Sequence, residues 1–180
     1  MGGTAARFAF WTSPFRPCCN GLMATPSFSI RQGVTADASV IAAFNAALAL
    51  ETEGLQLERD RLLAGVRAVF DDPAKGFYLV AEQNGEVVGQ LMITYEWSDW
   101  RNGAFWWVQS VFVAPAARGR GIYRGLYQAM LARAREQGNV CGVRLYVEGH
   151  NEAAKRTYAK LGMSATIYEM WEEDFVLRRD

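Results

Sequence analysis

Two Asn-Gly dipeptides, Asn84-Gly85 and Asn102-Gly103, constrain more than any other feature how this chain can fold. Asn84-Gly85 predicts a tight two-residue hairpin, because both residues tolerate the positive φ angles of a type I′ turn. Asn102-Gly103 precedes the next apolar stretch. Strand-type stretches at 77–81, 87–95 and 105–113 flank the two dipeptides. The sequence therefore predicts three consecutive antiparallel strands in the middle of the chain.

Strand and helix patterns on both sides of this meander complete the expected order of elements. The helices show apolar residues at helical spacing between capping residues and glycine or proline stops. The sequence predicts strands at 28–31, 143–147 and 165–171, and helices from Thr35 or Asp37 to Glu53, from Glu58 to Phe70, from Ile122 up to Gly138 and from Asn151 up to Gly162. The order β α α β β β α β α β indicates an α/β (α+β) fold, with a mixed, mostly antiparallel sheet flanked by helices.

The length of 180 residues, 51% of them hydrophobic, fits one globular domain. Residues 1–25 contain no acidic residue and mix glycine, proline and aromatic residues. We expect this stretch to be a disordered N-terminal extension, and the domain to span residues 26–175.

Charge and cysteine content exclude several classes of protein. Basic and acidic side chains number 19 each, so no net charge attracts nucleic acid or an anionic membrane. No apolar run approaches the roughly 20 residues that cross a bilayer. Three cysteines, two of them adjacent at Cys18 and Cys19, form no disulfide framework, and a single histidine, His150, excludes a His-rich metal site. We expect a soluble, cytoplasmic protein without a metal, and the sequence leaves a homodimer open.

The segment between the third meander strand and the next helix carries the strongest chemical signal. Gly119 and Gly121 allow a turn with exposed backbone N–H groups, and the helix that begins there adds the positive end of its dipole. Arg118 and Arg120 could donate further hydrogen bonds to the same anion, and phosphate is the natural guest. The alternative is that the glycines only make a tight connection and that the arginines are solvated.

Two motifs resemble those of the GNAT family of N-acetyltransferases. Arg118-Gly119-Arg120-Gly121-Ile122 matches the family's acyl-coenzyme A binding pattern, Gln/Arg-x-x-Gly-x-Gly/Ala. Asn151, Ala154, Tyr158 and Gly162 are spaced as in the family's helix Asn-x-x-Ala-x-x-x-Tyr-x-x-x-Gly-Phe. The predicted order of elements is also the family's, so the resemblance covers roughly residues 28 to 171.

Two positions depart from the family pattern. Tyr123 stands where the family usually has glycine or alanine, so a bulky side chain must cover the diphosphate of the cofactor or point away from it. Gln109 stands where many members carry a glutamate that serves as general base. Because an amide cannot accept a proton, the general base is unassigned.

The resemblance implies an acetyl-coenzyme A (acetyl-CoA) dependent N-acetyltransferase. It would transfer an acetyl group to a primary amine of a small molecule by direct attack of the amine on the thioester, without a metal. The alternative is a non-catalytic module of the same fold that senses acyl-CoA or mediates an interaction, an alternative that Gln109 motivates.

The resemblance also implies roles for individual residues. The cofactor would contact Val111, Phe112, Val113, Arg118, Gly119, Arg120, Gly121, Ile122, Tyr123, Asn151 and Tyr158. Its pantetheine arm would pair with the main chain around Val111 and Val113 as an added strand does, and a backbone N–H near Val111 would polarise the thioester carbonyl. Tyr158 would protonate the departing thiolate. By their residue types alone, Tyr158 is an aromatic side chain packed on a short helix and Asn151 a plain N-cap.

The expected acceptor site adjoins an aromatic-rich turn between the last two meander strands. Its aromatic residues are Tyr95, Trp97, Trp100, Phe105, Trp106 and Trp107. Aromatic faces combined with carboxylates suit a cationic amine. The candidate acceptor residues are Glu51, Glu53, Glu96, Asp99 and Gln109. The alternative is that the aromatic residues are half-buried strand positions and the carboxylates are solvated.

Overall fold

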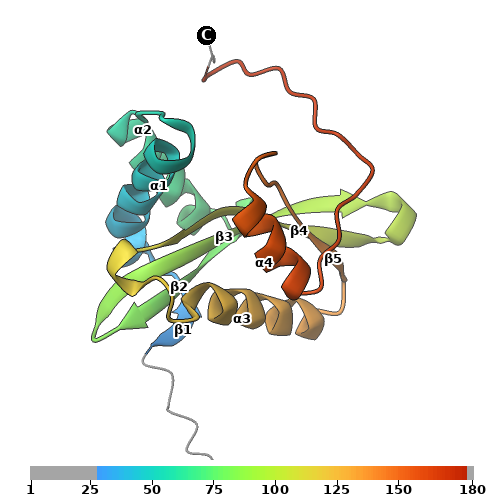
Figure 1. Cartoon of the computed structure of the whole chain (residues 1–180), viewed down its shortest axis with the longest axis horizontal. Coiled ribbons are helices and arrows are strands. Elements are labelled where there is room, and N and C mark those ends of the chain that lie inside the picture. The colour runs from blue at the N-terminus through green and yellow to red at the C-terminus, as the bar shows by residue number, and fades with distance from the viewer. Residues whose placement is uncertain (1–27, 178–180) are drawn as a thin grey trace, which may run out of the picture.

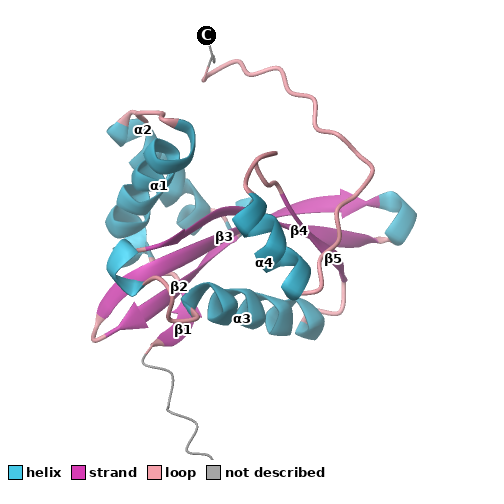
Figure 2. Cartoon of the chain, in the orientation of Figure 1, coloured by secondary structure: helices cyan, strands magenta, loops and turns pink. Residues whose placement is uncertain are grey.

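A five-stranded sheet organises residues 28–177, the part of the chain that the computed structural model describes (Figures 1 and 2). The strands are β1 (Ser29–Gln32), β2 (Phe77–Gln83), β3 (Glu86–Ser98), β4 (Gly103–Val113) and β5 (Val140–Leu145). They lie in the order β1-β2-β3-β4-β5, and every pair is antiparallel except β4 and β5. The predicted meander and the mixed, mostly antiparallel sheet are confirmed, whereas the prediction for residues 1–25 lies outside the described residues.

The two hairpins of the meander turn in different ways. Asn84 and Gly85 both have positive φ, 54° and 81°, as the two-residue turn between β2 and β3 requires. Between β3 and β4 a 3-10 turn, Asp99–Arg101, comes first, and Asn102 ends it in the left-handed region at φ 46°. The second Asn-Gly pair therefore closes a longer connection than a two-residue hairpin.

Within the described residues, four helices cover the two faces of the sheet. They are α1 (Ala38–Glu53), α2 (Arg59–Asp71), α3 (Ile122–Glu136) and α4 (Glu152–Lys160). In Figure 1, α1 and α2 lie together at one end of the sheet, and α3 and α4 lie together in front of it. All four helices begin and end within a few residues of the predicted positions.

The core has two layers because successive strand residues point to opposite faces of the sheet. Leu79 and Ala81 of β2 pack in the cluster that includes Leu126 and Met130 of α3. The alternate residues Tyr78 and Val80 pack in the second cluster, against α1 and α2. Burial on both faces explains why 77–81 is a continuous apolar run rather than an alternating one.

A charged cluster joins β1, β2 and the start of α1. Asp37 accepts hydrogen bonds from Arg31 Nη1 (2.7 Å) and Nη2 (3.0 Å) and from the Val34 N–H (2.9 Å). Arg31 Nε also donates to Glu82 of β2 at 2.8 Å. Asp37 is the N-cap residue of α1, as the sequence suggested, but its side chain makes no capping hydrogen bond, because its carboxylate accepts from Arg31 and the Val34 N–H. Thr35 lies in the 3-10 turn that precedes the helix.

The C-terminal part of the fold differs from the prediction. β5 covers Val140–Leu145 rather than 143–147, because its ladder with β4 stops at Leu145. The predicted last strand at 165–171 is wrong, since this segment is a loop that leaves Ile167 94% and Trp171 89% exposed (Figure 2). An alternating sequence becomes a strand only beside a partner, and within residues 28–177 β5 pairs only with β4. None of the helices in this range is long and apolar enough to span a bilayer.

Asp37→Ala is expected to lower the free energy of unfolding by about 1–3 kcal/mol, because it leaves Arg31 and the Val34 N–H short of an acceptor. Arg31 holds the pKa of Asp37 below its ordinary value. This stabilisation is therefore present above about pH 4 and is lost as the pH falls through the lowered pKa. Urea unfolding of both proteins between pH 3 and 7 measures it.

The matched control is Asp71→Ala, at the exposed end of α2, which should change stability by less than about 0.5 kcal/mol. A gap between wild type and Asp37→Ala that stays constant down to pH 3 would contradict the role given to the Asp37 carboxylate.

Candidate functional site

The parting of β4 from β5 creates an unpaired strand edge. Residues Ala104–Val108 of β4 pair with β5, and beyond Val108 the strand pairs only with β3 among the described residues. A bulge lies at the same point, because Val108 and Val111 are opposite Ile93 and Leu91, which leaves two residues of β4 facing one of β3. The β5 side of residues 109–113 can therefore pair with an extended ligand through its main chain.

A glycine loop follows directly at the end of this edge. Gly119 and Gly121 have φ of 77° and 79°, conformations that residues with a Cβ rarely adopt. The first N–H groups of a helix have no intrahelical acceptor, and none of the described side chains caps α3 at Gly121. Among residues 28–177, nothing lies within 4 Å of where a Cβ would stand on either glycine. This open end of α3 is suited to an anion.

A hollow of about 160 Å³ lies at this glycine loop. It is lined by Val113, Ala117, Arg118, Gly119, Gly121, Ile122 and Tyr123. The glycine cradle, the uncapped helix end and the hollow coincide, so the residues present fit a diphosphate group. Of the predicted cofactor residues, Phe112 and Ile122 are buried in the core, and only their main chain is available to a ligand.

Arg118 links this loop to the end of α1. Its Nη1 and Nη2 donate to Glu51 Oε1 and Oε2 at 2.9 and 2.7 Å, and its Nε donates to the Val113 carbonyl at 2.9 Å. Arg118 also holds the pKa of Glu51 below its ordinary value. The sequence assigned Arg118 to the cofactor and Glu51 to the acceptor, whereas the structure joins the two. Arg120, the other predicted phosphate ligand, is exposed.

Tyr158 of α4 lies beside the first turn of α3. Its ring meets the ring of Tyr123 edge to face, with centroids 6.2 Å apart. Burial raises the pKa of Tyr158 above its ordinary value, so its phenol stays protonated well beyond neutral pH. Asn151 accepts a hydrogen bond from the Ala154 N–H at 3.0 Å, which makes it the N-cap of α4.

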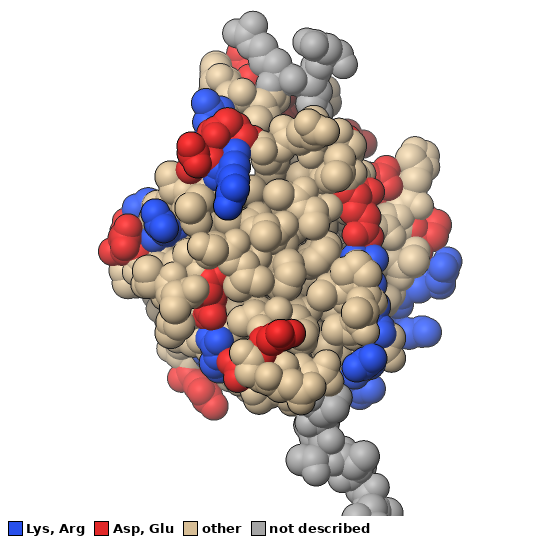
Figure 3. Space-filling view, turned by 90° about the vertical axis from the view of Figure 1, so that its left-hand side faces the viewer, with Lys and Arg blue, Asp and Glu red and all other residues tan. Residues whose placement is uncertain are grey.

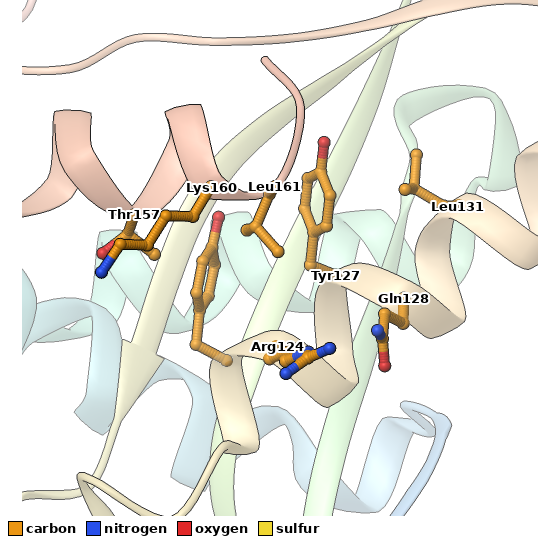
Figure 4. Close-up of a pocket in the computed structure, with 8 residues that line it drawn as sticks. Arg124, Tyr127, Gln128, Leu131, Thr157, Lys160 and Leu161 are labelled. Atoms are coloured by element: carbon orange, nitrogen blue, oxygen red, sulfur yellow. The ribbon is translucent and has the colours of Figure 1, made fainter.

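A second hollow, of about 440 Å³, lies between α3 and α4 (Figure 4). Its lining residues are Tyr123, Arg124, Tyr127, Gln128, Leu131, Thr157, Lys160 and Leu161. In Figure 4 the ring of Tyr127 rises from α3 toward α4, from which Lys160 and Thr157 project. Apart from Tyr123, sequence analysis missed these residues as site candidates, although Arg124 and Gln128 are four residues apart and so share a face of α3.

The predicted acceptor carboxylates do not form one group. Glu96 accepts from Arg144 Nη1 at 2.7 Å and from Trp107 Nε1, and Asp99 accepts from the Trp100 N–H. Both residues belong to the β3–β4 hairpin, which extends away from α1, the helix that ends with Glu51 and Glu53 (Figure 1). These four carboxylates thus lie on two separate parts of the fold, and a shared role at the acceptor site stays a prediction.

The aromatic residues of the expected acceptor site differ widely in exposure, and Gln109 bonds to a neighbouring strand. Trp106 is a core residue, 1% exposed, whereas Trp100 is 86% exposed. Gln109 Nε2 donates to Thr94 Oγ1 at 2.9 Å across the β3–β4 pair. Neither an amide nor a hydroxyl takes a proton at neutral pH, so this pair leaves the general base unassigned.

Charge is balanced over the face that Figure 3 presents. Acidic and basic side chains lie next to one another around a central area that has few of either. Among the described residues no group of three or more His, Cys, Asp and Glu side chains could hold a metal ion.

Comparison with known proteins gives a consistent result. The model of the acetyltransferase (GNAT) family matches residues 43–163. The crystal structure of a possible acetyltransferase from Clostridium difficile 630 is 43% identical, covers 83% of this chain and 99% of that chain, and superposes with a TM-score of 0.78. An aminoglycoside N-acetyltransferase in complex with CoA has the same fold, with a TM-score of 0.69 at 14% identity.

Curated relatives are named mycothiol acetyltransferases. The protein of Corynebacterium aurimucosum is 36% identical over 117 residues, which are 63% of this chain and 38% of that protein. The protein of Tsukamurella paurometabola is 33% identical over 136 residues, 73% of this chain and 46% of that protein. The chain thus spans less than half the length of these relatives. The family model matches residues 43–163, and the 43% identical structure is covered over 99% of its own length. The chain therefore belongs to the acetyltransferase (GNAT) family.

Proposed function

We propose that the chain is an acetyl-CoA-dependent N-acetyltransferase that acts on a primary amine of a small molecule. The observation that carries the proposal is the hollow at the glycine loop, which joins the unpaired edge of β4 to the uncapped start of α3. The names of the curated relatives support a small-molecule acceptor. The proposed location is the cytoplasm, in keeping with cysteines that give no disulfide framework.

The main chain does most of the binding in this proposal. Backbone N–H groups from Gly119 to Arg124 hold the diphosphate of the cofactor, and the unpaired edge around Val111 holds its pantetheine arm. When bound, acetyl-CoA supplies the activated acetyl thioester. The Val111 N–H is proposed to stabilise the developing negative charge on the carbonyl oxygen. The Val113 carbonyl is already bonded to Arg118 Nε, which favours Val111 as the pairing residue.

Tyr158 is the proposed general acid. Its raised pKa keeps the proton on the phenol oxygen at neutral pH, as donation to a departing thiolate requires. Gln109 and Thr94 cannot serve as general base, so the amine must arrive uncharged and release its proton to solvent. Activity should therefore rise with pH toward the pKa of the acceptor amine.

A second candidate function is a non-catalytic module that senses acyl-CoA. The observation that favours it is the Gln109–Thr94 hydrogen bond, because Gln109 stands where many family members have a glutamate that serves as general base. A thiol-release assay with acetyl-CoA separates the two functions, using amino acids, polyamines, aminoglycosides and the unacetylated amine precursor of mycothiol as acceptors. The proposed enzyme turns over with at least one amine. Cofactor binding without turnover on any of them would favour the sensing module.

Gly121→Val is expected to abolish cofactor binding, because valine resists a φ of 79°. In the wild type, acetyl-CoA at one hundred times its Kd should add roughly 2.7 kcal/mol of stability and raise Tm by about 5–10 °C. Thermal unfolding with and without acetyl-CoA measures this shift. Gly138→Val is the matched control, since Gly138 has a φ of 70° at the opposite end of α3. An equal ligand shift in Gly121→Val would refute the loop assignment.

Tyr158→Phe is expected to lower kcat by about 100- to 10,000-fold, the range typical of general acid catalysis, while the Kd for acetyl-CoA changes little. The phenylalanine keeps the ring packed against Tyr123, so a purely structural tyrosine predicts near-normal turnover. The pH–rate profile should keep its rise toward alkaline pH and lose any fall that comes from the tyrosine. The control is Tyr127→Phe. Tyr127 lies one turn of α3 beyond Tyr123, and this variant should keep a normal kcat.

Glu51→Gln is expected to weaken acetyl-CoA binding by about two- to fivefold, because Arg118 loses one of its two anchors. The KM for the amine should stay unchanged, and Glu53→Gln provides a control in the same helical turn. Steady-state kinetics with each substrate varied in turn tests this. A rise in the amine KM alone would instead support the acceptor role that the sequence suggested for Glu51.

A further inference from the structure

The hydroxyl of Tyr123 is a buried donor without a partner among the described residues. Tyr123 lies in the first turn of α3, at the motif position where the family usually has glycine or alanine. The motif that surrounds Tyr123 therefore does not account for this hydroxyl.

An unpartnered buried hydroxyl is costly. Leaving such a group without a hydrogen bond typically costs about 1–3 kcal/mol. Burial also raises the pKa of Tyr123, and the nearby Tyr158 and Tyr127 raise it further. The phenol is thus a permanent donor that needs an acceptor.

The surroundings of Tyr123 indicate where an acceptor can come from. The residue lines both the hollow at the glycine loop and the larger hollow between α3 and α4. The rings of Tyr127 and Tyr158 both lie close to Tyr123, each with its centroid 6.2 Å from that of Tyr123. Tyr123 therefore stands between the proposed diphosphate site and the proposed acid.

Access to the hydroxyl depends on α4, the helix that carries Tyr158. None of the residues of α4 is fully buried, and a hollow of about 440 Å³ lies between α4 and α3 beside the contact of Tyr158 with Tyr123. Displacing α4 or turning the Tyr158 ring therefore breaks few apolar contacts. A ligand that enters along β4 can uncover the Tyr123 hydroxyl at small cost.

We propose that Tyr123 binds the cofactor through its side chain as well as its main chain, and that its hydroxyl donates a hydrogen bond to an acceptor oxygen of bound coenzyme A. This inference rests on the proposed function and extends it. The free protein bears the cost of the unpartnered hydroxyl, and binding removes that cost. Removing the hydroxyl should therefore affect the free and the bound protein in opposite ways.

The test is Tyr123→Phe, which deletes only the hydroxyl. Without ligand, its Tm should equal or exceed that of the wild type. Its Kd for coenzyme A, measured by calorimetry, should rise by about 5- to 20-fold. The matched control is Tyr127→Phe, whose hydroxyl is not among the buried, unpartnered groups and whose Kd should stay within about twofold.

Two fragments identify the oxygen that accepts the bond. If the affinity loss in Tyr123→Phe persists with ADP, the acceptor belongs to the diphosphate. If it persists with pantetheine instead, the acceptor is an amide carbonyl of the arm. Either result supports the proposal.

The outcomes separate the two proposals. A wild type that fails to bind coenzyme A would overturn the proposed function itself. A wild type that binds, together with Tyr123→Phe that binds equally well, would overturn only the role of Tyr123. A drop in the Tm of ligand-free Tyr123→Phe would also overturn it, since the hydroxyl would then already have a partner in the free protein.

Discussion

The divergence of β4 from β5 after Val108 is the constraint on which the rest of the site depends. While the two strands are paired, their main-chain groups satisfy one another, and where they part, β4 offers an open edge to a ligand. The bulge at Gln109 and Ser110 bends the strand at this same place. The edge then leads toward the glycine loop, so an extended ligand paired with β4 would bring an anionic group to that loop.

The side chains around the β4 edge and the glycine loop mainly hold the main chain in position. Arg118 fixes the loop between α1 and the end of β4 through Glu51 and the Val113 carbonyl. The buried Gln90, whose Nε2 donates to Asn45 Oδ1 at 2.7 Å, ties the centre of the sheet to α1 in a similar way. The aromatic side chains of Tyr123 and Tyr158 then form the wall where α3 and α4 meet.

The sequence predicted those features that depend on the backbone conformation of a few neighbouring residues. The turn at Asn84-Gly85 and the helix start at Gly121 depend on backbone conformations that few residues adopt, so the residue types reveal them. Contacts between segments far apart in the sequence have no comparable signature in the residue types. Glu51 and Arg118 are 67 residues apart, and nothing in either neighbourhood marks them as partners. The expected strand at 165–171 failed for the same reason, because a strand depends on a partner edge that its own sequence does not specify.

Hydrogen–deuterium exchange of the backbone amides, with and without acetyl-CoA, tests the central claim most directly. The account predicts slower exchange in two segments, 109–113 on the unpaired edge of β4 and 119–124 at the glycine loop and the start of α3. Exchange in α2, which lies outside the site, should not change. Saturating acetyl-CoA that leaves both segments unprotected, or that protects only residues elsewhere, would contradict the account.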